Sequence, residues 1–424
     1  MFSMWAPDTP TPIAHRLDKI IRSLNHKGVE VVLVSFYKSD RDFKEQLVRH
    51  YSLERIFPFL RRFTNLRSND VHESKLPDVE NGVALVSNVK RFFVALARCL
   101  FAPDINIVFA LPASLLLVWA ILKHNAAYVF SVTNPASFAF TGSFTGWLMR
   151  RKIITDLGDL WYVIKEPRLN FQFEKRFHRW LEKSTVQRSN LVTFAYPELM
   201  ELFMTQYPEL KDRMRVMEQG YDGNFVSHIG VQKKKTDVFT IGYFGSLRMN
   251  EQYKTFFSLL DAFKIFLKEN PHLKTKIKLL LAGSISHEFL QKIKSPDFAE
   301  NAEYLGYLQA GELETKMESC DAFIVVTGAK KIPFSYLVPQ KLYMYMPYKK
   351  PVIYVGYAGK QVQRLKKIFP AVYPFFPDEK EEIKTCLLKI VNGEFSEVEI
   401  DNTELLKLDF RNQFNLAFSG YCKS

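Results

Sequence analysis

A lysine opens a short helix in the segment VPQKLYMYMPYKKPVI, residues 338–353. Lys341 follows Pro339 by two positions, which predicts a place in the first turn of that helix. The free N–H groups and the positive end of the helix dipole favour an anion there, and an ammonium group strengthens this preference. The pattern therefore predicts an anion site in front of a buried strand, PVIYVGY, although an exposed surface lysine would give the same sequence.

Glycine follows predicted strands at three places in the second half of the chain, in IGYFGSLRMNEQYKT, LLLAGS and AEYLGYL. A glycine at a strand end lets backbone N–H groups approach a phosphate, and nearby cations add charge-assisted hydrogen bonds. Each pattern alone also describes an ordinary strand-to-helix turn, whereas three in register favour one nucleotide-like ligand. The residues so placed are Gly242, Gly245, Ser246, Arg248, Lys254, Gly283 and Tyr307.

Polar residues also follow predicted strands in the first half, where they could orient an acceptor or move a proton. Asp156 and Asp159 lie in TDLGDLW, and Asn134 lies in SVTNPAS. His15 stands beside Arg16, where the first long helix begins. Carboxylates serve as general bases and also as helix caps, and His15 can equally be a capping or surface residue. The catalytic candidates are therefore Asp159, His15 and Asn134, with the structural alternatives left open.

The elements that must hold these residues follow an alternating order. In the first half, a helix over residues 14–28 leads into VEVVLVSF, and INIVFAL, AAYVFSV, KIITDLG and NLVTFAY are expected to be further strands. MFSMW is the one candidate for a strand before that helix, so the first strand is expected to be short or incomplete. Strands that alternate with helices predict βαβ units around a parallel sheet.

The longest apolar stretch runs from Ile107 to Leu122 and contains a proline and a serine. It falls short of the roughly 18 to 20 apolar residues that a membrane-spanning helix needs. We expect a buried strand, a turn at Pro112 and a core helix.

After GVQKKKTD, which is expected to be a linker, strands and helices alternate again from VFTIGYFGSL to PVIYVG. The predicted fold class is α/β, with two doubly wound Rossmann-like domains that face each other across a cleft. Ligands of such sheets sit outside the carboxyl ends of the strands. The expected domains are 1–225, 226–400, and a C-terminal helix within 401–424 that packs back towards the first domain.

Length and composition agree with two soluble domains, because 424 residues exceed the size of one ordinary core. The net charge of +13 suggests an anionic partner, such as nucleic acid, a phosphorylated small molecule or an acidic membrane face, or else a merely basic surface. The 4 scattered cysteines indicate neither a zinc site nor a disulfide framework, and they fit a reducing cytoplasm best. MFSMWAPDTPTP does not have the pattern of a secretory signal.

The order of these motifs resembles that of the family 4-like GT-B glycosyltransferases. The series IGYFGSL, LLLAGS, AEYLGYL, CDAFIVV, VPQKLYMYM and KKPVI is similar to their C-terminal domain. TDLGDLW, NLVTFAY, EQGYD and PDTPTPIAHR are similar to pieces of their N-terminal domain, so that the similarity covers nearly the whole chain. It implies a retaining hexosyltransferase that moves a sugar from a UDP- or GDP-linked donor to a glycan or lipid-linked acceptor.

The resemblance also implies roles for individual residues. The donor side takes Gly245, Ser246, Arg248, Lys254, Gly283, Tyr307, Lys341 and Met344, and the acceptor side takes Arg16 and Trp161. Three positions depart from the family's pattern. Met344 stands where a glutamate usually receives the ribose, Gly158 stands where relatives have an arginine, and residues 9–12 replace a usual glycine pair.

Transfer from such a donor needs the leaving diphosphate stabilised, which cations and helix N-termini can do without a metal. No DxD motif flanked by an apolar strand is present, so neither metal nor cofactor is expected. FPFLRRF, residues 57–63, has the composition of an interfacial segment or of an ordinary amphipathic helix. We expect a cytoplasmic protein, with peripheral contact at the acidic inner face of the cell membrane, that serves cell-surface polysaccharide or glycoconjugate synthesis.

Other functions stay open at this point. A nucleotide-sugar epimerase could share the architecture, and a non-catalytic partner protein could retain the fold without donor binding, which Met344 favours. A nucleic-acid binder would need a recognisable module, and the sequence contains none, so nucleic acid is not expected as a partner.

Overall fold

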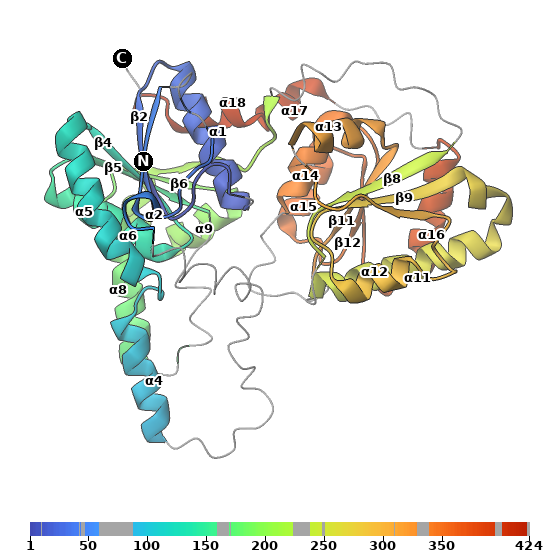
Figure 1. The fold of residues 1–424 in the computed structure, drawn as a ribbon, viewed down its shortest axis with the longest axis horizontal. Coiled ribbons are helices and arrows are strands. Elements are labelled where there is room, and N and C mark those ends of the chain that lie inside the picture. The colour runs from blue at the N-terminus through green and yellow to red at the C-terminus, as the bar shows by residue number, and fades with distance from the viewer. Residues whose placement is uncertain are drawn as a thin grey trace. The chain divides into compact units, whose positions relative to one another are not determined.

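The structure is a computed structural model that divides into two compact units (Figure 1). Unit 1 comprises Met1–Glu218 and Phe414–Ser424, and unit 2 comprises Gln219–Gln413. The structure describes residues 1–9, 11–41, 43, 47–58, 88–158, 169, 171–223, 238–247, 251–308, 310–328, 339–394 and 401–421. The domain boundary expected at 225/226 and the linker GVQKKKTD lie outside the described residues.

Unit 1 is built on a seven-stranded parallel sheet in the order β3-β2-β1-β4-β5-β6-β7. The strands are β1 (Phe2–Ser3), β2 (Val31–Ser35), β3 (Val48–Ser52), β4 (Tyr128–Val132), β5 (Lys152–Leu157), β6 (Leu191–Phe194) and β7 (Met214–Val216). The short first strand expected from the sequence is confirmed, because β1 pairs with both β2 and β4 near the middle of the sheet. β3 and β7 were not anticipated.

The helices of unit 1 connect these strands in the expected alternation. They are α1 (Pro12–His26), α2 (Leu53–Ile56), α4 (Asn88–Leu100), α5 (Ile107–His124), α6 (Ala136–Leu148), α8 (Gln172–Arg188), α9 (Pro197–Gln206) and the 3₁₀ helix η2 (Pro208–Arg213). α1 begins two residues before the helix predicted over residues 14–28. Thr11 is the N-cap, its hydroxyl accepts the N–H of Ala14 at 3.2 Å, and Pro12 opens the first turn. The sequence thus fixes this helix start locally.

The stretch from Ile107 to Leu122 corrects the sequence-based expectation. It forms no strand and no turn at Pro112. Instead, α5 is one continuous helix with Pro112 inside it. A continuous apolar run has no period that separates a buried strand from a helix, and this helix is apolar on two faces. The strand interpretation was therefore wrong.

Unit 2 contains a six-stranded parallel sheet in the order β10-β9-β8-β11-β12-β13. Its strands are β8 (Phe239–Phe244), β9 (Ile277–Ala282), β10 (Ala302–Tyr304), β11 (Ala322–Val326), β12 (Val352–Val355) and β13 (Val372–Phe375). Its helices are α11 (Glu251–Glu269), η3 (Pro271–Lys276), α12 (His287–Ile293), α13 (Ala310–Ser319), α14 (Gln340–Tyr345), η4 (Met346–Tyr348), α15 (Lys360–Ile368), α16 (Lys380–Val391) and α17 (Asn402–Lys407). α18 (Phe410–Ala417) begins in unit 2 and ends in unit 1. The described residues 401–421 thus hold two helices, where the sequence predicted one within 401–424.

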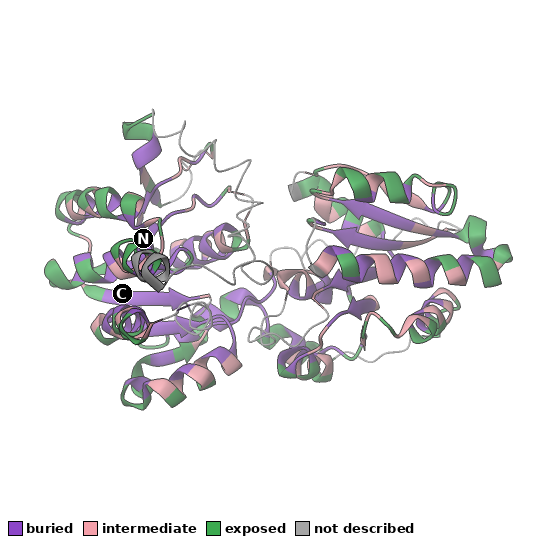
Figure 2. Cartoon of the chain, turned by 90° about the horizontal axis from the view of Figure 1, so that it is seen from below, coloured by how far each residue is buried: buried purple, intermediate pink, exposed green. Residues whose placement is uncertain are grey.

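The central strands of both sheets are buried, whereas the edge strands β3, β7, β10 and β13 are only partly buried, and the outer faces of the surrounding helices are exposed (Figure 2). In unit 2, β11 and β12 are buried along their full length, which explains their uninterrupted apolar sequences AFIVV and VIYV. The α/β class with two doubly wound parallel sheets is thereby confirmed.

The strand order of unit 2 reverses between β8 and β11. The chain runs from β8 outward through β9 to β10, and then returns to place β11 on the other side of β8. The connections after β8 and β11 therefore diverge from neighbouring strand ends. In open α/β sheets this reversal is where ligands bind.

Candidate functional site

Lys341 lies at this reversal in unit 2. It stands in the first turn of α14, which follows β11, and its ammonium nitrogen Nζ donates a hydrogen bond of 2.7 Å to the phenolic oxygen of Tyr243 in β8. The same nitrogen lies 4.1 Å from the centroid of the Tyr243 ring, within the range of a cation–π contact. Two chain segments that are 98 residues apart thus meet at one cation.

The absence of a side chain at Gly245 leaves room for the Lys341 ammonium group. Its φ is +152°, and a Cβ atom added there would lie 2.1 Å from Cε and 2.2 Å from Nζ of Lys341. Any side chain at this position would collide with the lysine, so the close approach requires glycine. The ammonium group therefore lies directly against the backbone of Gly245, the residue that follows β8.

The glycine-bearing ends of β8, β9 and β10 are joined to one another. The N–H of Gly245 donates to the carbonyl of Ala282 at 2.8 Å, and the N–H of Gly283 donates to the carbonyl of Gly306 at 2.8 Å. Gly283 has a φ of +124°, and a Cβ there would lie 2.3 Å from the carbonyl oxygen of Gly245. Three successive loops thus lie side by side at the carboxyl edge, as the three motifs in register predict.

Burial lowers the pKa of Lys341 to about 7. The cause is desolvation, and no carboxylate among the described residues forms an ion pair with this ammonium group. Burial also raises the pKa of the Tyr243 phenol, which keeps it neutral beside the lysine. An anion that binds beside a desolvated cation of this kind stabilises its charged form.

A second layer of hydrogen bonds fixes the site. The Tyr243 hydroxyl donates to the carbonyl of Ser246 at 3.0 Å, which ties the loop after β8 to its own strand. The N–H of Phe244 donates to the hydroxyl of Tyr345 on α14 at 3.1 Å, and the Tyr345 ring stacks on Phe323 with centroids 4.2 Å apart. α14 is therefore held against β8 and β11 at the level of Lys341.

The remaining donor-side candidates occupy less constrained positions. Ser246 is exposed after β8, Lys254 is exposed on α11, and Tyr307 is exposed after β10. Met344 is half-buried on α14, one turn beyond Lys341. Arg248 lies outside the described residues, so its role at the donor diphosphate together with Lys341 stays a prediction.

In unit 1, two of the catalytic candidates lie near neighbouring strand ends. His15 is exposed on the first turns of α1, whose preceding strand is β1, and Asn134 follows β4, the neighbour of β1. Desolvation, with the charge of Lys19, lowers the pKa of His15. Asn134 has a φ of +71°, and its carbonyl accepts the indole N–H of Trp5 at 2.9 Å. Asp159 and Trp161 lie outside the described residues.

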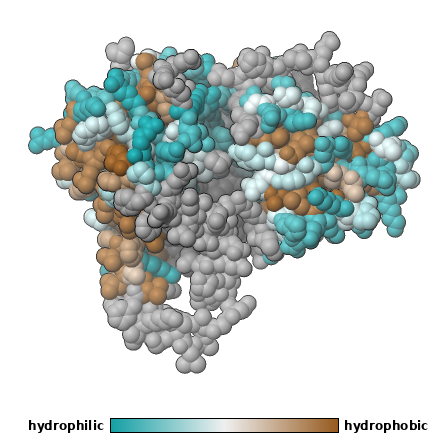
Figure 3. Space-filling view, in the orientation of Figure 1, coloured by the Kyte–Doolittle hydropathy of each residue, from teal (hydrophilic) through white to brown (hydrophobic). Residues whose placement is uncertain are grey.

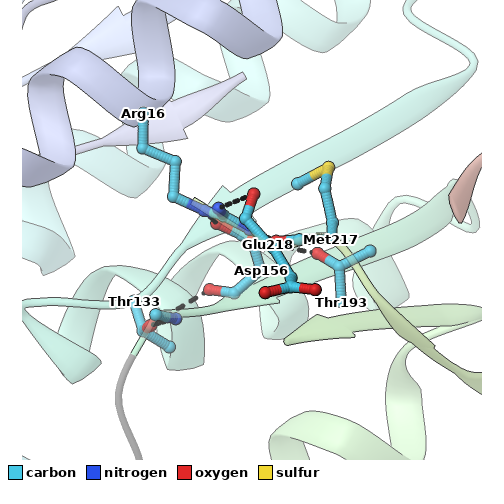
Figure 4. Close-up of polar contacts among 7 residues, drawn as sticks. Arg16, Thr133, Asp156, Thr193, Met217 and Glu218 are labelled. Carbon is cyan, nitrogen blue, oxygen red and sulfur yellow. Dashed lines mark hydrogen bonds and ion pairs between the residues drawn. The ribbon is translucent and has the colours of Figure 1, made fainter. Parts of the chain in front are cut away.

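Arg16 is buried, and its guanidinium group is hydrogen-bonded within unit 1 (Figure 4). Its Nε and Nη2 donate to the two carboxylate oxygens of Asp156 at 2.7 and 2.8 Å. Nη2 and Nη1 also donate to the carbonyls of Met217 at 2.7 Å and Glu218 at 3.3 Å. Asp156 accepts a further hydrogen bond of 2.6 Å from Thr193. This fork joins α1 to β5 and to the segment that leaves β7, so Arg16 acts here by positioning the backbone.

Tyr243 and Tyr345 were missed by the sequence analysis. Both lie in apolar runs, where a tyrosine cannot be told from any other core aromatic. Only the strand order, which sequence periodicity does not reveal, brings Tyr243 beside the helix that follows β11. Within the described part of the chain, no group of three or more His, Cys, Asp and Glu side chains could hold a metal ion.

Comparisons with solved structures give many matches, whereas no protein-family model and no curated protein sequence matches the chain. An Escherichia coli trehalose-6-phosphate protein bound to UDP-2-fluoro glucose is 11% identical, with a TM-score of 0.57 over 98% of this chain and 96% of that one. HepE of Anabaena, in complex with UDP and glucose, is 16% identical with a TM-score of 0.52, over 98% and 94% of the two chains.

A third match is a Listeria monocytogenes protein assigned as a UDP-N-acetylglucosamine 2-epimerase. It is 9% identical, with a TM-score of 0.52 over 98% of this chain and 92% of that one. Together with the two parallel sheets, these similarities show that the chain has the GT-B glycosyltransferase fold. The fold resemblance stated from the sequence is confirmed.

Proposed function

We propose that this protein is a glycosyltransferase that uses a nucleotide-sugar donor, and that Lys341 binds the donor diphosphate. The observation that carries the proposal is the placement of one desolvated ammonium group at the strand-order reversal, against the bare backbone of Gly245. A diphosphate is an anion of the size and charge that this arrangement would stabilise.

The proposed chemistry needs charge stabilisation more than acid–base catalysis. When the bond between sugar and diphosphate breaks, negative charge builds up on the leaving phosphate, and a fixed cation in a poorly hydrated site lowers that barrier. We propose that the protonated Lys341 and the backbone N–H groups near Gly245 and Gly283 supply this stabilisation without a metal. A UDP- or GDP-linked donor and retention of configuration at the anomeric carbon are the finer parts of the proposal, supported by the resemblance of the motifs.

The acceptor is proposed to be a glycan or a lipid-linked sugar near the cytoplasmic face of the cell membrane, in the synthesis of cell-surface polysaccharide or glycoconjugate. The support is the excess of basic over acidic residues in the first half of the chain. His15 and Asn134 are the described residues proposed to face this acceptor, and Asp159 and Trp161 keep the roles that the resemblance implies.

A thermal-shift screen against UDP-, GDP-, ADP- and CMP-sugars tests donor binding. A ligand at 100 times its dissociation constant raises the free energy of unfolding by about 2.7 kcal/mol. We expect stabilisation by a UDP- or GDP-sugar in the wild type and a much smaller effect in Lys341→Met. The active sugar is then incubated with candidate acceptors, and release of the nucleoside diphosphate is measured.

Two alternatives would give different results in these assays. An epimerase, a function favoured only by the Listeria match, would convert its UDP-sugar without an acceptor. A non-catalytic protein, which the half-buried Met344 favours, would give no shift with any donor.

A further inference from the structure

Helix α5 presents two apolar faces, and only one of them is covered. The inner face packs in a core cluster with Phe2 of β1, Val34 of β2 and Phe36, which directly follows β2. This face is made of Ile107, Ala110, Ala113, Leu117, Ala120 and Ile121. The outer face consists of Val108, Leu111, Leu115, Trp119 and Leu122, all exposed. Leu115 is 73% exposed and Leu122 is 63% exposed, although both are large aliphatic residues.

The exposed apolar surface continues onto neighbouring helices. α4 and its following turn expose Val94, Leu96, Leu100, Phe101 and Ile105, and α6 exposes Phe144, Trp147 and Leu148. α6 packs on both α5 and α8, and α4 packs on α8. Figure 3 shows hydrophobic atoms over α5 and along α4. We call the outer residues of α4, α5 and α6 the apolar face. An apolar surface of this extent on one unit marks an interaction site.

Cations outnumber carboxylates in the chain segment that carries the apolar face. Between Asn88 and Gly158 the carboxylates are Asp104 and Asp156, and both accept hydrogen bonds inside unit 1. The cations of the same range are Lys90, Arg91, Arg98, Lys123, Arg150, Arg151 and Lys152.

Aromatic rings and cations meet at this border. The Lys123 ammonium lies 4.5 Å from the Trp119 ring, and the Arg188 guanidinium of α8 lies 5.6 Å from the Trp147 ring. Tryptophan with lysine or arginine is the combination that residues at a membrane–water interface use, because each has an apolar body and a polar end.

We propose that the apolar face docks unit 1 on the surface of an anionic lipid bilayer. α5 then lies in the plane of the interface, with Leu111, Leu115 and Leu122 among the acyl chains. The exposed cations Lys123 and Arg150 then lie at the lipid phosphates. By length and composition α5 could also cross a membrane, with 33% of it buried inside the protein. A spanning position would expose the inner face and break its packing on Phe2 and Val34.

A second copy of the chain fits this surface less well. In a twofold dimer the same patch meets itself, which would bring Lys123 and Arg150 of each copy towards their own counterparts. No carboxylate of residues 88–158 is free to neutralise them, because Asp104 and Asp156 are engaged. Anionic lipid supplies the missing negative charge. The proposal is independent of donor binding, which concerns unit 2.

Vesicle flotation with the full chain tests the proposal. Vesicles of phosphatidylcholine with one-quarter phosphatidylglycerol are compared with pure phosphatidylcholine, each at low and high salt. We expect the wild type to float with the anionic vesicles, and less with neutral vesicles or at high salt. The double variant Leu111→Gln, Leu115→Gln should lower the partition coefficient about tenfold or more, because two aliphatic side chains no longer leave water.

Matched variants separate this effect from a general loss of apolar surface or charge. Leu406→Gln with Leu416→Gln removes two exposed leucines elsewhere and should leave flotation unchanged. Lys123→Gln with Arg150→Gln should weaken binding to anionic vesicles only, whereas Lys211→Gln with Lys268→Gln should not. Equal flotation of the Leu111→Gln, Leu115→Gln variant and the Leu406→Gln, Leu416→Gln variant would overturn the proposal. So would a stable wild-type dimer in light scattering that Leu111→Gln, Leu115→Gln dissociates, with no vesicle binding.

Discussion

The ammonium nitrogen of Lys341 lies 2.7 Å from the phenolic oxygen of Tyr243, across the strand-order reversal of unit 2. The Tyr243 hydroxyl donates its hydrogen bond to the carbonyl of Ser246, so that the lone pairs of the phenolic oxygen can accept from the lysine. The contact holds a cation at the carboxyl edge of the sheet without neutralising it. A site of this kind is organised before its anion arrives, which is the condition for strong electrostatic stabilisation.

Replacement of Lys341 by methionine removes the charge and keeps an unbranched side chain. A hydrogen bond to a charged partner contributes about 1.5–3 kcal/mol, so the dissociation constant of the preferred nucleotide-sugar should rise about 10- to 100-fold. Isothermal titration calorimetry measures the change, and Lys268→Met on the exposed face of α11 is the control. Equal affinity of wild type and Lys341→Met would remove Lys341 from the donor site.

Gly245→Ala should displace the lysine without deleting it. The new Cβ would lie 2.1 Å from Lys341 Cε, and the φ of +152° is one that alanine rarely adopts. We expect donor affinity to fall about as far as in Lys341→Met, with the protein still folded by circular dichroism. Gly311→Ala is the matched control, because a Cβ at Gly311 meets nothing within 4 Å and its backbone has no positive φ. Unchanged donor affinity in Gly245→Ala would show that the lysine's place against Gly245 is irrelevant to binding.

Donor affinity should depend on pH through Lys341. In the free protein its pKa is lowered to about 7, so the group is charged below pH 7 and neutral above it. A bound diphosphate favours the charged form and raises this pKa, so affinity should be constant below pH 7. Above it, affinity should fall by about tenfold per pH unit until the pKa of the bound state is reached.

A nucleotide-sugar is the right probe for this profile, because its phosphate diesters do not titrate near neutral pH. Tyr243 also stays neutral over the range, since burial raises its pKa. Lys341→Met should bind weakly and give a flat profile between pH 6 and 9. The same flat profile in the wild type would refute the assignment.

Arg16→Met should destabilise unit 1. Removal of one partner from a buried ion pair leaves Asp156 charged and buried, at a cost of about 3–5 kcal/mol. The 5 tryptophans all lie in unit 1, at positions 5, 119, 147, 161 and 180, so urea unfolding followed by tryptophan fluorescence reports on this unit.

The double variant Arg16→Met, Asp156→Leu supplies the control for that prediction. It should recover part of the loss, because it leaves no unpaired charge. Additive destabilisation in the double variant would show that the two side chains contribute independently, contrary to the geometry of the pair.

The sequence predicted the main strands of both sheets and the positions of their glycine-bearing ends, because local rules determine them. Apolar runs such as AFIVV are continuous where both faces are buried, and Gly245 and Gly283 stand where the backbone has a positive φ. Short strands such as β7 and β13 carry too few residues for a period to be visible.

The contacts that define the site could not be predicted in the same way. Whether Lys341 meets Tyr243 depends on β11 returning to the side of β8, which is a property of the whole sheet. Likewise, Arg16 in PDTPTPIAHR was expected on the acceptor side. Only the tertiary structure shows that its guanidinium group is buried in unit 1 and donates two hydrogen bonds to Asp156.

A crystal structure of the protein with its preferred UDP- or GDP-sugar tests the central claim most directly. We expect a phosphate oxygen within hydrogen-bond distance of Lys341 Nζ, in front of the loops that carry Gly245 and Gly283. A nucleotide bound elsewhere, with Lys341 still bonded to Tyr243 alone, would contradict the account.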